Sequence, residues 1–220
     1  MPKTNLRTEY LRTALDEGEA GEDPVELFRR WYEDAREAGE PEPNAMTLAT
    51  SDSAGRPSAR IVLCKEFDAE GFVFFTNYAS RKGRELAASP QACLLFFWPR
   101  LERQVRISGA VAQVSSEVSD RYFAERPRDA RIGAWASPQS EPIAGREELE
   151  ARFAQALQRF EGRDAVERPA HWGGYRLAPA AIEFWQGRAS RLHDRLLFTR
   201  RSAPAPSPAA HAWTRTRLAP

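Results

Sequence analysis

The spacing of hydrophobic residues divides the chain into an early helix, a long stretch of strands and a mixed final third. Asp23 and Pro24 predict the start of the helix, because Asp is a favoured N-cap and proline fits the first helical turn. Apolar residues then recur at helical spacing until Gly39, which ends the helix. Residues 1–22 show no sustained period, so they are predicted to form an N-terminal tail.

From residue 45 the apolar residues alternate along short segments separated by turns, which predicts antiparallel strands. The predicted strands cover residues 46–50, 60–64, 72–77, 93–98, 104–114, 175–177, 182–185, 191–199 and 213–218. Helices are predicted at residues 80–86, 115–124 and 146–160. The Pro- and Ala-rich residues 203–210 are predicted to form a mobile loop.

Many strands joined by short turns and interrupted by a few helices are typical of a mostly β, α+β fold. We therefore expect one domain over residues 23–220, an antiparallel barrel with peripheral helices. No GxGxxG or GxxxxGK[ST] motif is present, which argues against a Rossmann or P-loop nucleotide site.

Composition narrows the function classes. The 32 basic and 31 acidic residues leave a formal charge of +1, so no overall field attracts nucleic acid or an anionic membrane. No segment resembles a signal peptide or a membrane span, and a cytoplasmic protein is expected. Cys64 and Cys93 lie in strand-like segments without CxxC spacing and are predicted to be reduced core thiols. The three scattered histidines do not suggest a metal site, and no GxSxG motif suggests a Ser nucleophile.

The segment from Glu183 to Arg195 carries the most distinctive chemistry. If it is extended, Arg191, His193 and Arg195 point to one face, where their mutual repulsion favours an anionic ligand. The alternative is a solvated strand face with no ligand. Trp185 and its neighbour Phe184 favour the ligand, because a planar cofactor needs an aromatic wall.

Several other polar side chains suit the binding of anions or of a heterocycle. Arg81 and Lys82 follow Ser80 at a predicted helix N-terminus, which favours phosphate. Tyr122 and Arg126 lie one helical turn apart and form either a grip on a phosphate or a surface Arg packed on a Tyr. The remaining candidates are Arg60, Lys65, Gln104, Gln139 and Ser140. So many cationic groups in a nearly neutral chain suggest two phosphate-bearing ligands.

The sequence resembles the pyridoxine/pyridoxamine 5′-phosphate oxidases in ten ordered segments, from about residue 7 to residue 220. The segments are RIVLCK (60–65), FTN (75–77), SRK (80–82), LERQV (101–105), YF with RPRD (122–129), IGAW (132–135), QS (139–140), IEFWQG (182–187), RLHDR (191–195) and RLAP (217–220). This resemblance implies an FMN-binding split β-barrel that works as a homodimer, with FMN at the subunit interface. It also implies oxidation of pyridoxine 5′-phosphate or pyridoxamine 5′-phosphate to pyridoxal 5′-phosphate, with O₂ as acceptor and H₂O₂ as product, and NH₃ released from the amine.

The resemblance also assigns roles to individual residues. Arg191 and His193 are implied to be catalytic and to cover the substrate ring. Other residues implied to contact the substrate are Lys65, Tyr122, Arg126 and, in the tail, Arg7 and Tyr10. Those implied to contact FMN are Arg60, Ile61, Val62, Leu63, Lys65, Phe75, Thr76, Arg81, Lys82, Gln104, Gln139, Ser140, Trp185 and Arg195.

Two positions depart from the family pattern. Ala130 stands where a Ser is usual in the substrate-phosphate site, and the missing hydrogen bond predicts a roughly tenfold or greater loss of affinity. Phe75 replaces a frequent Tyr, a minor change if that position contributes only backbone contacts. Two alternatives therefore stay open: a related split-barrel flavin oxidase with another substrate, and a non-catalytic FMN- or B6-binding protein.

Overall fold

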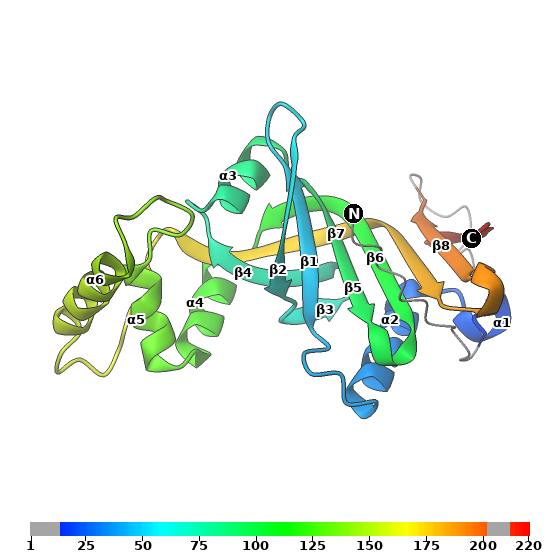
Figure 1. Ribbon diagram of the computed structural model, residues 1–220, viewed down its shortest axis with the longest axis horizontal. Helices are drawn as coiled ribbons and strands as arrows, with labels where there is room; N and C mark the ends of the chain where they lie inside the picture. Colours follow the sequence, from blue (N-terminus) through cyan, green and yellow to red (C-terminus); the bar gives the residue numbers. More distant parts are fainter. Residues whose placement is uncertain (1–13, 202–211) are drawn as a thin grey trace, which may run out of the picture.

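The computed structural model describes residues 14–201 and 212–220. In this part of the chain the strands form one nine-stranded antiparallel sheet with helices around it (Figure 1). The predicted α+β class with an antiparallel barrel and peripheral helices is confirmed. Arg7, Tyr10 and the predicted loop at residues 203–210 lie outside the described residues.

The order of the strands shows why the sheet curls. The strands are β1 (Ala45–Ser51), β2 (Pro57–Leu63), β3 (Glu66–Asp68), β4 (Gly71–Asn77), β5 (Gln91–Trp98), β6 (Arg103–Gln113), β7 (Trp172–Gln186), β8 (Asp194–Arg200) and β9 (Trp213–Leu218). They are ordered β2-β1-β5-β6-β7-β4-β3, while β8 pairs with both β7 and β9. The edge strands β2 and β3 are separated in sequence only by Cys64 and Lys65. The sheet must therefore bend until these two edges meet, which produces a split barrel.

Strand β7 spans the molecule and links its two ends. It pairs with β4 through its first residues, with β6 along most of its length and with β8 through its last residues. The sequence pattern predicts two separate strands here, at 175–177 and 182–185. The structure instead places Pro179 opposite Gly109 at a register shift, where a bulge accommodates the missing N–H. Figure 1 shows β7 running from the helical end of the molecule to the end that holds α1 (Glu17–Ala20).

Helix α2 (Pro24–Glu37) packs an apolar face against the barrel strands. The side chain of Asp23 accepts a hydrogen bond from the Val25 N–H at 2.8 Å, so the predicted N-cap is present. Phe28 is fully buried, and its ring lies 4.9 Å from that of Phe72 and 5.0 Å from that of Phe96. These edge-to-face contacts fix the helix on the core.

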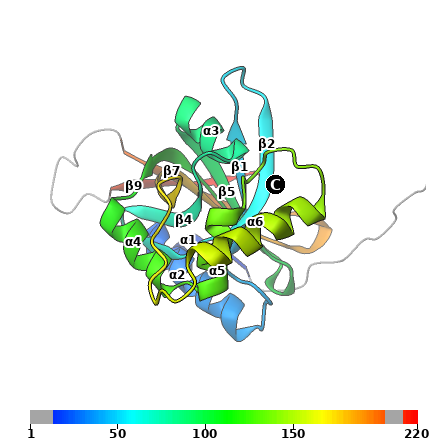
Figure 2. The same ribbon diagram turned by 90° about the vertical axis from the view of Figure 1, so that its left-hand side faces the viewer.

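Helices α4 (Ser116–Glu125), α5 (Arg128–Ala136) and α6 (Arg146–Arg159) gather at the end of the molecule where β7 begins (Figures 1 and 2). They bury a second hydrophobic cluster that includes Phe123, Ile132 and Phe160. Helix α5 was not predicted, because Pro127 was interpreted only as the end of α4; it is also the N-cap of α5. No helix among the described residues is long and apolar enough to cross a membrane.

The described part of the predicted tail, residues 14–22, is packed against the fold. Leu15, which precedes α1, and Ala20, the last residue of α1, are both buried. Arg217 in β9 donates to the Leu15 carbonyl at 3.0 Å and pairs with Glu17 at 2.7 Å. Apolar burial and this ion pair therefore order a segment whose sequence shows no helical period.

Cys64 and Cys93 are free thiols, the first buried and the second half-buried. Burial raises the pKa of both, that of Cys64 to about 12. Both side chains therefore stay protonated, as predicted for thiols in strands without a chemical role.

Candidate active site

Eleven of the residues with predicted binding roles line one cavity of about 460 Å³. They are Arg60, Ile61, Val62, Leu63, Lys65, Phe75, Thr76, Lys82, Tyr122, Arg126 and Gln139. Asn77 and Trp172 complete the lining and were not predicted from the sequence. Residues far apart in sequence thus converge on a single hollow at the seam of the curled sheet.

The cavity lies where β2, β4 and α4 approach α3 (Arg81–Ala88). The edge strand β2 supplies Arg60 to Leu63, and the closed seam brings them beside β4, which supplies Phe75 to Asn77. Ser80 caps α3, accepting a hydrogen bond from the Gly83 N–H at 3.3 Å, and this cap starts the helix just before Lys82. Strand pairing and one helix cap therefore place the cationic residues.

Lys82 forms the centre of a polar group on one wall of this cavity. Its Nζ donates to the Thr76 hydroxyl at 3.2 Å and to Gln139 Oε1 at 3.0 Å. Burial lowers the pKa of Lys82, and the charge of Arg60 adds to this effect. An anion in the cavity would relieve the repulsion between these two cations, which makes this wall suitable for a phosphate.

An aromatic stack forms another wall. The Phe75 ring lies 4.0 Å from that of Tyr122 and 5.5 Å from that of Trp172, the Tyr122 and Trp172 rings are 6.2 Å apart, and all three rings are nearly parallel. The side chain of Phe75 therefore packs in the wall. The stack presents a flat apolar surface beside the polar group.

Arg126 and Lys65 add positive charge to the aromatic wall. The Arg126 guanidinium lies 4.6 Å from the centre of the Trp172 ring, and Lys65 Nζ lies 5.9 Å from that of Tyr122. Arg126 Nη1 is buried and has no hydrogen-bond partner among the described residues. Burial lowers the pKa of Arg126. A buried, unsatisfied cationic donor is costly unless a ligand pairs with it, so Arg126 indicates an anion site.

Ala130 adjoins Arg126, as the resemblance implied. Both line a neighbouring cavity of about 290 Å³, together with Gln139 and Trp172. The methyl group of Ala130 provides no hydrogen-bond donor at this point. The departure from the family pattern therefore lies beside the cationic group that it was expected to affect.

A second group of predicted residues lies at the other end of β7. Gln104 pairs with Trp185, and Trp185 pairs with Arg195 in the sheet register. Trp185 follows Trp172 by thirteen residues on this strand, or about 40 Å at the rise of an extended chain. Among the described residues, the lining of the 460 Å³ cavity includes no member of this second group, which consists of Gln104, Trp185, Arg191, His193 and Arg195.

Within this second group, Glu183 fixes the direction of Arg195. The Glu183 carboxylate is 7% exposed and accepts from Arg195 Nε at 2.8 Å, and it also pairs with Arg106. The His193 ring lies 4.6 Å from that of Trp185, and its Nδ1 accepts from the Arg188 N–H at 3.1 Å. Burial, with a smaller contribution from the charge of Arg191, lowers the pKa of His193, which favours the neutral ring.

The prediction that Arg191 belongs to an extended strand is wrong. Ala189–Arg191 form a short 3₁₀ turn, and β8 begins only at Asp194. Ser190 and Arg191 have φ values of 55° and 63°, in the left-handed region that side chains rarely adopt. The alternation with His193 and Arg195 therefore does not place Arg191 on a strand face; a turn presents this exposed side chain instead.

Arg81 and Ser140 also lie outside the cavity lining. Arg81 is 60% exposed and donates from Nε to Glu85 at 2.8 Å. Ser140 is exposed and has a φ of 72°. Glu85 was missed by the sequence analysis, because a Glu on a short helix resembles an ordinary surface residue. No local signal in the sequence marks Glu85, because its partners Thr50 and Ser58 are distant from it in the sequence.

Comparisons with known proteins agree with this geometry. A family model described as "Pyridoxamine 5'-phosphate oxidase" matches residues 32–160, and one described as "Pyridoxine 5'-phosphate oxidase C-terminal dimerisation region" matches residues 172–220. Over 216 residues, 98% of each chain, the sequence is 58% identical to a pyridoxine/pyridoxamine 5′-phosphate oxidase of Burkholderia cenocepacia (strain HI2424). A relative of the same name from Burkholderia multivorans is also 58% identical.

Two solved structures share the fold. PhzG from Burkholderia lata 383, crystallised with tetrahydrophenazine-1-carboxylic acid, is 33% identical, with a TM-score of 0.83 over 92% of this chain and 95% of that one. A pyridoxamine 5′-phosphate oxidase-related, FMN-binding protein from Nostoc punctiforme PCC 73102 has a TM-score of 0.68 over 88% and 97% of the two chains. At 19% identity, the latter supports the fold alone.

The curled sheet defines a split-barrel fold. The family to which the chain belongs supports FMN as the cofactor. The phosphate-binding chemistry of the Lys82 wall and the flat aromatic surface fit a phosphorylated planar group. The chain belongs to the pyridoxine/pyridoxamine 5′-phosphate oxidase family, which is a family of oxidoreductases.

Proposed function

We propose that this protein oxidises pyridoxine 5′-phosphate or pyridoxamine 5′-phosphate to pyridoxal 5′-phosphate, with O₂ as the electron acceptor and H₂O₂ as a product. One observation carries the proposal: a single cavity holds two groups of cations, Arg60 with Lys82 and Lys65 with Arg126. Two groups suit two phosphates, one from FMN and one from the substrate. The names of the relatives support the B6 phosphates as the substrates.

On the cofactor side, Lys82, Thr76 and Arg60 would hold the FMN phosphate. Their hydrogen-bonding groups already face one wall, so binding would require little rearrangement. When bound, the flavin supplies the redox chemistry, because it accepts two electrons and transfers them to O₂. The residues of the chain would position the flavin and supply the positive charge that holds its phosphate.

On the substrate side, Arg126, Lys65 and Tyr122 would hold the phosphate of the vitamin. The unsatisfied Nη1 of Arg126 gains a hydrogen-bond partner when an anion binds. The free-energy cost of burying this guanidinium is therefore offset only in the complex. The flat stack of Phe75 and Trp172 beside it narrows the cavity to a slot that suits a planar ring.

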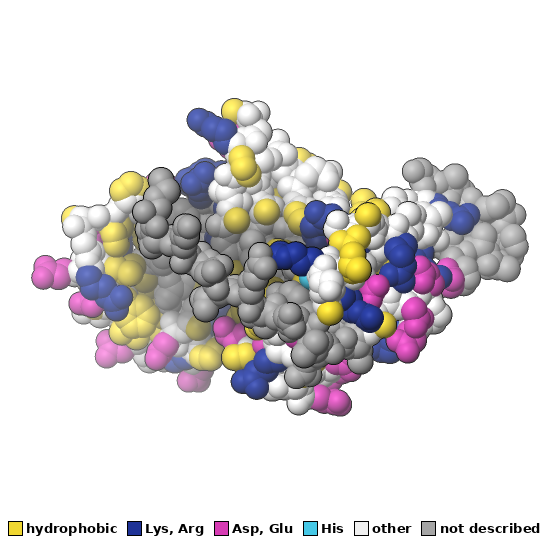
Figure 3. Space-filling model, turned by 45° about the vertical axis from the view of Figure 1, so that its right-hand side comes forward, with side chains coloured by type: hydrophobic (Ala, Val, Ile, Leu, Met, Phe, Trp, Pro, Cys, Tyr) yellow, Lys and Arg dark blue, Asp and Glu magenta, His cyan; other side chains and the backbone are white. Residues whose placement is uncertain are grey.

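Gln104, Trp185 and Arg195 lie at the other end of β7 from the cavity. We propose that a second subunit brings its copies of these residues to the cavity. The family model for residues 172–220 describes a dimerisation region, which supports a homodimer with FMN at the subunit interface. Exposed apolar side chains support an interface as well, because Ile61 and Phe97 are 65% and 52% exposed. On the face in Figure 3, hydrophobic side chains also lie beside Lys and Arg side chains. In this arrangement Arg191 and His193 of one subunit would cover the substrate bound by the other.

The test is a peroxide assay on FMN-loaded protein with pyridoxine 5′-phosphate, pyridoxamine 5′-phosphate and unphosphorylated pyridoxine. We expect H₂O₂ in amounts equal to the pyridoxal 5′-phosphate formed, and only with the phosphorylated substrates. Protein that binds FMN but produces no peroxide with either phosphate would refute the proposal while leaving the cofactor intact.

A second candidate is a flavin oxidase that acts on another substrate. Two observations favour it: the 33% identity to PhzG, whose structure holds tetrahydrophenazine-1-carboxylic acid, and Ala130 in place of the usual Ser. The same assay with a reduced tricyclic carboxylic acid separates the candidates. A kcat/KM higher for that acid than for both B6 phosphates would favour the alternative.

A further inference from the structure

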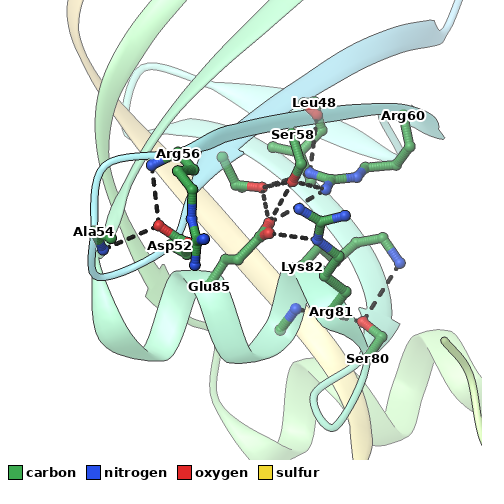
Figure 4. Close-up of polar contacts among 12 residues, drawn as sticks. Leu48, Asp52, Ala54, Arg56, Ser58, Arg60, Ser80, Arg81, Lys82 and Glu85 are labelled. Carbon is green, nitrogen blue, oxygen red and sulfur yellow. Dashed lines mark hydrogen bonds and ion pairs between the residues drawn. The ribbon is translucent and has the colours of Figure 1, made fainter. Parts of the chain in front are cut away.

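Glu85 is a buried carboxylate at the edge of the candidate cofactor site, and it forms more polar contacts than any other residue of α3 in the described chain (Figure 4). It is 5% exposed. Oε2 accepts from the Thr50 hydroxyl at 2.5 Å and from the Ser58 hydroxyl at 2.7 Å. The two carboxylate oxygens also meet two different guanidinium groups, those of Arg60 and Arg81.

The contacts of Arg60 fix its guanidinium completely. Nη1 donates to the Leu48 carbonyl at 3.1 Å and to the Thr50 hydroxyl at 2.5 Å. Nη2 donates to the Ser58 hydroxyl at 2.5 Å and to Glu85 at 3.2 Å. Because Thr50 and Ser58 in turn donate to Glu85, these four side chains form a closed network around one negative charge.

Arg81 is held differently. Its Nε donates to Glu85 at 2.8 Å. Its two Nη groups form no hydrogen bond with any described residue, so they are available to bind an anion. The side chain is 60% exposed, and a free Arg on such a surface would sample many rotamers. The contact with Glu85 selects one of them.

We propose that Glu85 is a positioning residue for FMN: it orients Arg81, whose Nη groups can receive the cofactor phosphate, and it fixes Arg60, which contributes its positive charge to the same wall. This inference rests on the proposed assignment of the phosphate to the Lys82 wall. Arg60, Arg81 and Lys82 carry three positive charges, and Glu85 reduces the total to two, which matches a phosphate dianion. Glu85 itself does not line the cavity.

This role makes a prediction opposite to that of simple electrostatics. Glu85 is an anion near the site of another anion, so charge repulsion alone predicts that its removal tightens FMN binding. If the carboxylate orders the two guanidinium groups, its removal weakens binding, because part of the binding energy must then order them. The sign of the change therefore decides between the two effects.

The experiment measures the Kd of FMN and of riboflavin, which lacks the phosphate, from quenching of flavin fluorescence by flavin-free protein. For Glu85→Gln we expect the Kd of FMN to rise at least about tenfold, the effect of losing one charge-assisted hydrogen bond. The Kd of riboflavin should change by less than about twofold, because the proposal assigns the two guanidinium groups to the phosphate, which riboflavin lacks. An FMN affinity that is unchanged or tighter overturns the proposal, as does equal weakening for both flavins.

Two controls complete the design. Glu150→Gln removes an ion pair of the same spacing, Arg146–Glu150 at 2.7 Å, from the exposed face of α6 and should leave both Kd values unchanged. If Glu85→Gln does not fold, Ser58→Ala loosens the same network at one hydroxyl, and the Kd of FMN should rise at least about threefold. Wild-type protein that binds no FMN would refute the proposed function instead, so the two failures are distinguishable.

Discussion

Replacing Arg126 with Met tests whether this residue binds the substrate phosphate or only stabilises the fold. Met keeps the aliphatic contact with Trp172 but removes the guanidinium, whose Nη1 is buried without a partner among the described residues. In the free protein this substitution removes an unsatisfied buried donor, worth about 1–3 kcal/mol, and a cation–π contact, worth about 0.5–2 kcal/mol in the opposite direction. The two terms nearly cancel, so the Tm should change little.

The effect on the substrate should be large. A phosphate held by two charge-assisted hydrogen bonds loses about 3–4 kcal/mol when the guanidinium is absent, which corresponds to a rise in KM of several hundredfold. Steady-state kinetics with pyridoxine 5′-phosphate measure this, and thermal unfolding measures the Tm. Arg121→Met, at an exposed position of α4, the helix that Arg126 caps, is the matched control. A falling Tm with an unchanged KM would show that Arg126 is structural and would refute the reasoning.

Three further predictions follow from the same structure. Arg191→Ala should lower kcat/KM at least about a hundredfold while the Kd of FMN stays constant, because this exposed side chain touches neither cofactor wall; normal turnover would exclude it from the reaction. Ala130→Ser restores a donor beside Arg126 and should lower the KM for pyridoxine 5′-phosphate about tenfold, so an unchanged KM would mean that the hydroxyl does not reach the phosphate. Burial alone would raise the pKa of Glu85, but hydrogen bonds from Ser58, Thr50 and Arg81, with the charge of Arg60, lower it from 4.5 to about 2. Since the folded pKa is the lower one, the carboxylate stabilises the fold above pH 4.5 and loses this effect as the pH falls through about 2. The advantage of wild type over Glu85→Gln in the free energy of unfolding should therefore shrink by about 3 kcal/mol between pH 6 and pH 2; urea unfolding at several pH values measures it, and a constant difference would contradict the pKa.

Local sequence signals predicted the elements that depend on neighbouring residues. Asp23 and Ser80 cap α2 and α3 as expected, because an N-cap needs only a few adjacent positions. The pattern could not predict that 175–177 and 182–185 form one strand, since the bulge between Pro179 and Ala181 forms only when β7 pairs with the neighbouring strand β6. Pro127 was ambiguous for a similar reason, because proline both ends one helix and begins the next.

In the candidate site, too, some features could be predicted from the sequence, while others depend on residues that meet only in the folded protein. Residue types and the family resemblance identified the cationic side chains, and the curled sheet brings Arg60, Lys82 and Arg126 to one cavity. The left-handed turn at Arg191 could not be predicted, because the alternation of charges suggested a strand. Glu85 was missed because its role depends on Thr50 and Ser58, which approach it only in the folded protein.

The most direct test of the central claim is the spectrum of the bound flavin without oxygen. When pyridoxine 5′-phosphate is added to the FMN-loaded protein, the flavin absorbance should bleach, and it should return when air is admitted. Pyridoxine without the phosphate should leave the flavin oxidised, since Arg126 and Lys65 then have no anion to hold. A flavin that stays oxidised with the phosphorylated substrate, or that bleaches equally with both, would contradict the account.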